Sequence, residues 1–195
     1  MVDLSRYKGI IFDMDGTLID SMGAHMKAWE KTCEHFGYPF DLDYMYGLGG
    51  VPTMKTAELL NAKYSKQNDP QEVGQFKKNT WLAMDQTPTL IDDTFQIFNA
   101  NLGSKKIAVG TGAERSGAET LLGHHGLLGK LDALVTSSDV VNGKPAPDTF
   151  LKAAESIGVA PEDCVVFEDT KIGFEAASRA GMDCIMVING KVQQG

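Results

Sequence analysis

Two carboxylates, Asp13 and Asp15, stand two residues apart directly after a short apolar run. On an extended segment, residues two apart point to the same side. One carboxylate can therefore attack a substrate while the other moves protons. Attack by Asp13 on a phosphate ester would give an acyl phosphate, and Asp15 could protonate the leaving alkoxide and then deprotonate the hydrolytic water. The pair predicts phosphoryl-transfer chemistry with Asp13 and Asp15 as catalytic residues.

A magnesium site is expected beside this pair. Glu168 and Asp169 follow another apolar run, and a parallel sheet would bring all four acids to one edge. Clustered carboxylates repel one another, so they need a divalent cation, and hard oxygen ligands favour Mg²⁺. We expect Asp13, Asp15, Asp169 and Glu168 to form the metal site. Asp13 and Asp169 would be direct ligands, whereas Glu168 could bind through water or position Lys144.

The phosphoryl group needs cationic and hydrogen-bonding partners, because its negative charge must be offset. Thr111 and Gly112 follow the apolar run 106–110 and precede a helix pattern, where free N–H groups favour anions. The segment imitates a dinucleotide fingerprint, but Arg115 stands where the third glycine belongs. Lys144 lies in a loop whose backbone is fixed by the helix start that follows it. Thr111, Gly112 and Lys144 are thus the predicted phosphate-binding residues.

Short apolar strands that alternate with helix patterns must position these residues. Helices between the strands favour a parallel sheet covered on both faces, with its active site at the carboxyl ends of the strands. The predicted fold class is α/β, with a Rossmann-like parallel sheet core and an inserted helical cap domain. The predicted strands are 8–12, 106–110, 131–136, 164–167 and 184–188, and the predicted helices are 21–36, 53–63, 70–83, 114–122, 147–157 and 172–180.

The segment after the first strand differs from the rest of the chain, because it is polar, helix-like and free of a clear β run. We expect residues 1–19 and 88–195 to form the core domain and residues 20–87 to form the helical cap. Segments near 16–22 and 85–92 would hinge this cap. Its closure would exclude bulk water from the site.

Together these residues resemble the four motifs of the haloacid dehalogenase-like hydrolases, in order and over essentially the whole chain. The motifs are Asp13-Met14-Asp15-Gly16-Thr17, Thr111, Lys144 and Glu168-Asp169. In having an aspartate at position 15, the chain resembles the phosphatases and phosphomutases of that family. It differs at this position from the family's dehalogenases, phosphonatases and ATPases. The amino-acid sequences of segments 143–148 and 167–170 resemble those of the sugar-phosphatase and β-phosphoglucomutase-like branch. The resemblance is strongest to the fructose-1-phosphate/6-phosphogluconate phosphatases of that branch.

The resemblance implies a Mg²⁺-dependent phosphatase that hydrolyses small sugar or sugar-acid monophosphates through an aspartyl-phosphate on Asp13. The alternative is a β-phosphoglucomutase-type phosphomutase, because Asp15 and the metal would serve both reactions. Thr53 stands where the mutase pattern has an arginine, which weakens that alternative. A non-catalytic sensor of a phosphorylated metabolite would bind without turnover, and the intact nucleophile disfavours it.

Two cap residues are candidate substrate contacts. The resemblance puts His25 near the site, although a partly exposed helix histidine would need no such role. Lys55 follows the glycine-rich loop 49–52, which can approach a substrate closely, and an arginine matches it in the fructose-1-phosphatase-like proteins. Lys55 could equally be a solvated helix lysine. Trp81 could belong to the apolar core of the cap or face the substrate, and the core is favoured.

The composition limits the partners and the location. The 195 residues include 26 acidic and 18 basic side chains, for a net charge of −8, without the basic cluster that nucleic-acid binding requires. No apolar run reaches membrane-spanning length, and the N-terminus lacks the apolar region of a signal peptide. Three cysteines without a close pair fit free thiols in a reducing cytosol. We expect a cytoplasmic monomer that acts on a small phosphorylated molecule, without nucleic-acid or membrane partners.

Overall fold

A six-stranded sheet forms the centre of the computed structural model, which describes residues 2–84 and 88–193. The strand order is β3-β2-β1-β4-β5-β6, and the first five strands along the chain are parallel, as predicted. A short sixth strand runs antiparallel to β5 and was not predicted, because it has only two residues. The strands are β1 (Gly9–Phe12), β2 (Lys106–Gly110), β3 (Ala133–Val135), β4 (Cys164–Glu168), β5 (Asp183–Ile188) and β6 (Lys191–Val192).

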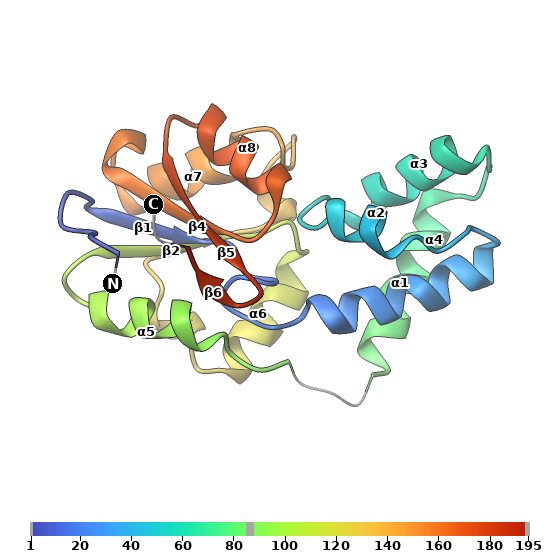
Figure 1. The fold of residues 1–195 in the computed structure, drawn as a ribbon, viewed down its shortest axis with the longest axis horizontal. Coiled ribbons are helices and arrows are strands. Elements are labelled where there is room, and N and C mark those ends of the chain that lie inside the picture. The colour runs from blue at the N-terminus through green and yellow to red at the C-terminus, as the bar shows by residue number, and fades with distance from the viewer. Residues whose placement is uncertain (1, 85–87, 194–195) are drawn as a thin grey trace.

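Helices cover both faces of the sheet, because each strand alternates its side chains between two apolar clusters. Ile10 and Phe12 of β1 point into one cluster, whereas Ile11 points into the other. The first cluster also contains residues of α5 (Asp92–Asn101) and α6 (Arg115–His124), which lie on one side of the sheet in Figure 1. The second contains residues of α7 (Asp148–Ile157) and α8 (Lys171–Arg179), on the opposite side.

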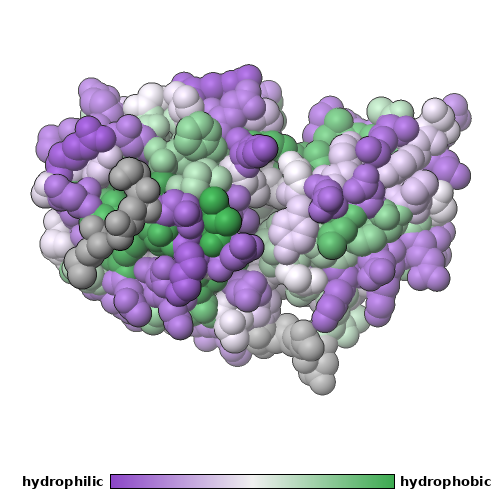
Figure 2. All heavy atoms as spheres, viewed as in Figure 1, coloured by the Kyte–Doolittle hydropathy of each residue, from purple (hydrophilic) through white to green (hydrophobic). Residues whose placement is uncertain are grey.

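Four further helices between β1 and β2 in sequence pack on one another beside the sheet (Figure 1). They have an apolar cluster of their own, which includes Met22, Trp29, Cys33 and Val73. Figure 2 shows this four-helix unit as a separate lobe that meets the sheet-bearing part along a notch. Its helices are α1 (Met22–Phe36), α2 (Leu42–Gly47), α3 (Thr53–Tyr64) and α4 (Pro70–Leu82).

Helix α1 ends where the sequence predicted, because Gly37 adopts the left-handed conformation with φ of 70° and stops it. The helices α2 and α5 were not predicted. The six-residue helix α2 is too short to show a helical period, but the side chain of Asp41 caps its start. The predicted cap boundary at residue 87 and the predicted start of a hinge at residue 85 lie outside the described residues. None of the helices in the described part of the chain is long and apolar enough to cross a membrane.

Candidate active site

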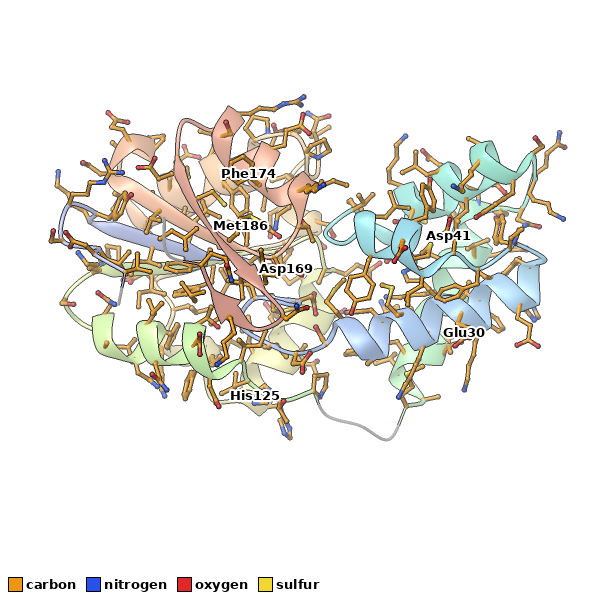
Figure 3. The ribbon with its side chains drawn as sticks, in the orientation of Figure 1. Glu30, Asp41, His125, Asp169, Phe174 and Met186 are labelled. Atoms are coloured by element: carbon orange, nitrogen blue, oxygen red, sulfur yellow. The ribbon has the colours of Figure 1, made fainter. Side chains whose placement is uncertain are left out.

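The polar residues that follow β1, β2 and β4 meet at the carboxyl edge of the sheet. Strand β1 lies between β2 and β4, so Asp13 occupies the middle of that edge. Thr111 directly follows β2, and Glu168 is the last residue of β4. Asp169 lies on the side of the sheet that faces the four-helix unit (Figure 3). The parallel topology thus brings together side chains that are more than 150 residues apart in sequence.

Lys144 is the cation at the centre of the site. Its Nζ donates to Asp13 Oδ1 at 2.6 Å and to Glu168 Oε2 at 2.7 Å, and its side chain is 0% exposed. Burial alone would lower the pKa of Lys144, but the two carboxylates outweigh burial and raise it above its usual value. Lys144 therefore stays protonated and holds one oxygen of Asp13 in a fixed place.

Glu168 uses both of its carboxylate oxygens within the protein. Oε2 accepts from Lys144, while Oε1 accepts from the N–H groups of Asp169 and Thr170 and from the Thr170 hydroxyl. The Cβ that any substitution would add at Gly173 lies 1.9 Å from Oε2, so the carboxylate is also packed closely against α8. This geometry supports the expectation that Glu168 positions Lys144.

Asp13, Glu168 and Asp169 form an acidic cluster that suits a hard divalent cation. One oxygen of each carboxylate lies within 4.8 Å of the others. Burial and the neighbouring negative charges raise the pKa of Asp13 to about 8 and that of Asp169 to about 9. Such a donor set of oxygens is stabilised by a cation between them, and it fits Mg²⁺. Asp15 was expected to contribute to this site, but its carboxylate is outside the cluster.

The carboxylate of Asp15 is held by the start of α1 instead. Ser21 Oγ donates to Asp15, and His25 Nε2 lies 3.1 Å from Asp15 Oδ1. Lys77 Nζ lies 2.8 Å from His25 Nδ1, and because an ammonium group can only donate, a protonated Lys77 requires Nδ1 to accept and places the imidazole proton on Nε2, next to Asp15. Trp81 stacks on the His25 ring, with 5.5 Å between centroids. A chain of contacts therefore runs from α4 through α1 to Asp15.

Burial and mutual interaction shift the pKa values of the three titratable groups in this series of contacts. Burial lowers the pKa of Lys77 to about 8, and burial together with the Lys77 charge lowers the pKa of His25. Burial would raise the pKa of Asp15, but His25, Ser21 and Lys77 outweigh it and lower that pKa. In the described state, Asp15 is thus an ionised carboxylate that can accept a proton.

A cavity of about 660 Å³ lies between the four-helix unit and the carboxyl edge of the sheet. The edge of the sheet contributes four lining residues, Asp13, Asp15, Thr111 and Gly112. The Thr111 hydroxyl oxygen accepts a hydrogen bond from the N–H of Ala113 at 3.0 Å, which orients the hydroxyl group. Lys55 is not among the described residues that line it. Its ammonium group is exposed on α3 and pairs with Glu58, so the structure does not bring the second cap candidate to the site.

Three residues of the site were missed by the sequence reasoning or placed elsewhere. Neither Ser21 nor Lys77 belongs to one of the sequence motifs described above. The one signal for Lys77 was its spacing from Trp81, because residues four apart share a face of a helix. Nothing in the sequence says which face meets the core. Trp81, which was expected in the cap core, lines the cavity and packs against the apolar cluster of the sheet instead.

The four-helix unit touches the core at glycine positions. A Cβ added at Gly112 would lie 2.2 Å from the carbonyl oxygen of Gly50, and one added at Gly143 would lie 2.8 Å from Cγ of Pro52. Lys78 of α4 also pairs with Glu114 of the core at 2.6 Å. The loop before α3 therefore rests directly on the segments that carry Thr111 and Lys144.

We expect Gly112→Ala to lower kcat/KM by about 100-fold, because the methyl group would push the four-helix unit away and misplace the Asp15 contacts. The N–H of residue 112 would remain available to a phosphate. The measurement is steady-state hydrolysis of p-nitrophenyl phosphate together with the melting temperature. Gly123→Ala, whose added Cβ would have no described neighbour within 4 Å, is the matched control and should behave as the parent does. Parental activity in Gly112→Ala would show that this close approach is not needed.

Comparison with known proteins gives a family and a fold for the chain. Residues 10–187 match the haloacid dehalogenase-like hydrolase family. The chain is 40% identical to the fructose-1-phosphate phosphatase of Escherichia coli over 185 residues, which are 93% of this chain and 97% of that protein. It is 29% identical to the β-phosphoglucomutase of Bacillus subtilis, over 96% of this chain and 86% of that protein. A crystal structure of a hydrolase from Pseudomonas syringae superposes with a TM-score of 0.86 at 22% identity, covering 95% of this chain and 87% of that one.

Proposed function

The chain belongs to the haloacid dehalogenase-like hydrolase family, and we propose that it is a Mg²⁺-dependent phosphatase of small sugar or sugar-acid monophosphates. The reaction would proceed through an aspartyl-phosphate on Asp13. One observation carries this proposal: the Asp13 carboxylate lies at the base of the cavity, fixed by Lys144 at 2.6 Å and next to Asp169. The similarity to the fructose-1-phosphate phosphatase supports the substrate class.

In the first step, the Asp13 oxygen that is not bound to Lys144 attacks phosphorus, and the bond from phosphorus to the leaving alkoxide oxygen breaks. Lys144, Thr111 and the N–H of Gly112 hold the phosphoryl oxygens. Asp15 gives its proton to the alkoxide. A phosphate dianion bound beside Asp15 favours that protonated form, because like charges raise the pKa of the carboxyl group.

In the second step, Asp15 accepts a proton from water, whose oxygen attacks the phosphorus of the aspartyl-phosphate. The bond between phosphorus and Asp13 breaks and releases inorganic phosphate. His25 and Lys77 act as positioning residues, because they hold Asp15 at a fixed distance from the reacting atoms. Asp15 thus serves as acid and then as base without leaving its contacts.

Asp13 and Asp169 are the proposed direct ligands of Mg²⁺. Gly16 has φ of 85°, and a Cβ there would lie 2.2 Å from Asp169 Oδ2, so the backbone next to Asp15 is in contact with this ligand. The carboxylate of Asp15 is engaged with Ser21 and His25, so we propose no contact of that carboxylate with the metal. When bound, Mg²⁺ offsets the negative charge of the carboxylates and the transferring phosphoryl group.

We further propose that residues 20–87 act as a cap over a core formed by residues 1–19 and 88–195. The cavity between the two parts and the Gly50–Gly112 contact support a closed position for this cap. Opening would admit the substrate, and closing would bring His25 and Lys77 to Asp15.

A phosphomutase of the β-phosphoglucomutase type is the second candidate, because the relative from Bacillus subtilis carries that name. It would use the same Asp13 and Asp15, but it would return the phosphoryl group to another sugar hydroxyl. The two reactions are distinguished by their products.

The test is incubation of the purified protein with fructose-1-phosphate, 6-phosphogluconate and β-glucose-1-phosphate in Mg²⁺. We expect free phosphate from at least one ester. Removing the metal with EDTA should lower the rate by about 100-fold or more, and added Mg²⁺ should restore it. Isomerised sugar phosphate without free phosphate would identify a mutase. Tight binding of an ester without any product would identify a sensor, and unchanged activity in EDTA would rule out the metal.

A further inference from the structure

Apolar side chains that are partly or fully exposed line a part of the cavity next to the residues that hold Asp15. Met54 is 42% exposed and Leu82 is 61% exposed, yet both line the cavity. Trp81 lies beside Leu82 on α4 and also lines the cavity. We call Met54, Trp81 and Leu82 the apolar wall. Large apolar side chains left in contact with water at a cavity are typical of a ligand-binding surface.

The apolar wall is not explained by the packing of the four-helix unit. Met54 and Leu82 are absent from the apolar cluster that holds α1 to α4 together. A Cβ added at Gly74 of α4 would lie 3.6 Å from Sδ of Met54, an ordinary contact distance, so Met54 lies next to α4. Because Met54 and Leu82 are exposed and line the cavity, a molecule bound there can contact both side chains.

The charged groups near the apolar wall neutralise each other. Lys78 and Glu114 both line the cavity and form an ion pair at 2.6 Å, which spans it from α4 to the core. Thr111 and Gly112, two of the proposed phosphate-binding residues, line the same cavity together with Asp13. The Lys78–Glu114 pair therefore adds no net charge beside Met54, Trp81 and Leu82, and the alcohol part of a substrate held by its phosphate can contact these apolar side chains.

We propose that the apolar wall is a subsite for an apolar portion of the leaving group. This inference rests on the proposed phosphatase function and deepens it. Among phosphate monoesters with the same hydroxyl groups near the ester bond, the site prefers those whose alcohol also carries an alkyl or aromatic segment. Hydroxyl groups near the ester bond can still be accommodated, because Asp15 and Gln75 offer hydrogen-bonding groups in the same cavity.

The test uses a series of n-alkyl phosphates from methyl to hexyl, in which the chemistry at phosphorus stays constant. We expect kcat/KM to rise with chain length, by up to about fourfold for each added methylene group. Leu82→Ser and Met54→Ser should each lower the ratio of kcat/KM for hexyl phosphate to that for methyl phosphate. Leu42→Ser is the matched control, because Leu42 is a similarly exposed leucine of the same unit outside the described lining.

A flat or falling series in the parent protein would overturn the proposal, as would an identical series in Leu82→Ser, Met54→Ser and Leu42→Ser. These results leave the phosphatase function intact, since phosphate is still released. If no ester in the series or among the sugar phosphates is hydrolysed in Mg²⁺, the proposed function itself fails, and the subsite assignment fails with it.

Discussion

Asp13→Asn should lower kcat/KM for phosphate-ester hydrolysis by about 10⁴-fold or more, because an amide cannot form the covalent intermediate. The change retains the shape of the side chain and removes one negative charge from the acidic cluster. The protein should therefore stay folded, and without metal its melting temperature should not fall. Steady-state phosphate release and thermal unfolding of the same sample give both quantities.

The control for this substitution is Asp163→Asn, which removes a carboxylate that pairs with Lys8 at 2.7 Å on the surface. Its activity should equal that of the parent protein. If Asp13→Asn retains more than a few per cent of the parental rate in a sample free of other phosphatases, Asp13 is not the nucleophile.

Lys144→Met should affect both activity and stability. Methionine has a similar length but no charge, so Asp13 and Glu168 would lose the buried cation that lies between them. Breaking a buried ion pair from one side costs about 3–5 kcal/mol of unfolding free energy. Activity should fall by about 10²–10³-fold, because one phosphoryl-binding group is lost and Asp13 is no longer held in place. Denaturant unfolding and initial rates measure the two effects.

Glu168→Gln added to Lys144→Met should recover part of the lost stability, since the uncompensated charge is then smaller. Activity should not recover. Lys8→Met is the control, because Lys8 forms an exposed pair and its loss should leave stability nearly unchanged. A Lys144→Met variant as stable as Lys8→Met would contradict the role of Lys144 as the central cation.

The core of the fold was predictable because its signals are local. Ile10 to Phe12 form an apolar run that ends at an acid, and the same pattern recurs at β4, whereas the apolar run of β2 is followed by Thr111. Parallel pairing then places the carboxyl ends of these strands at the same edge of the sheet. This is why Asp13, Lys144, Glu168 and Asp169 could be grouped before any coordinates, and the structure brings these four together. Their catalytic and metal-binding roles remain predictions.

The part of the site that comes from the four-helix unit was less predictable. Lys77 is one of many lysines in amphipathic helices, and only the packing of α4 on α1 brings it to His25. Lys55 follows a glycine-rich loop and seemed the better candidate, but its position on α3 directs it to Glu58 and solvent. The orientation of a helix against another domain depends on contacts distant in sequence, such as that between Gly50 and Gly112.

The most direct test of the aspartyl-phosphate on Asp13 is to trap the intermediate. The protein is mixed with an isotopically labelled phosphate ester and Mg²⁺, quenched in acid within the first turnover, and digested for peptide mass spectrometry. We predict a phosphoryl group on the peptide that contains Asp13, its loss on treatment with hydroxylamine, and its absence in Asp13→Asn. Phosphate release at the parental rate with no label on any peptide, or with label on another residue, would contradict the account.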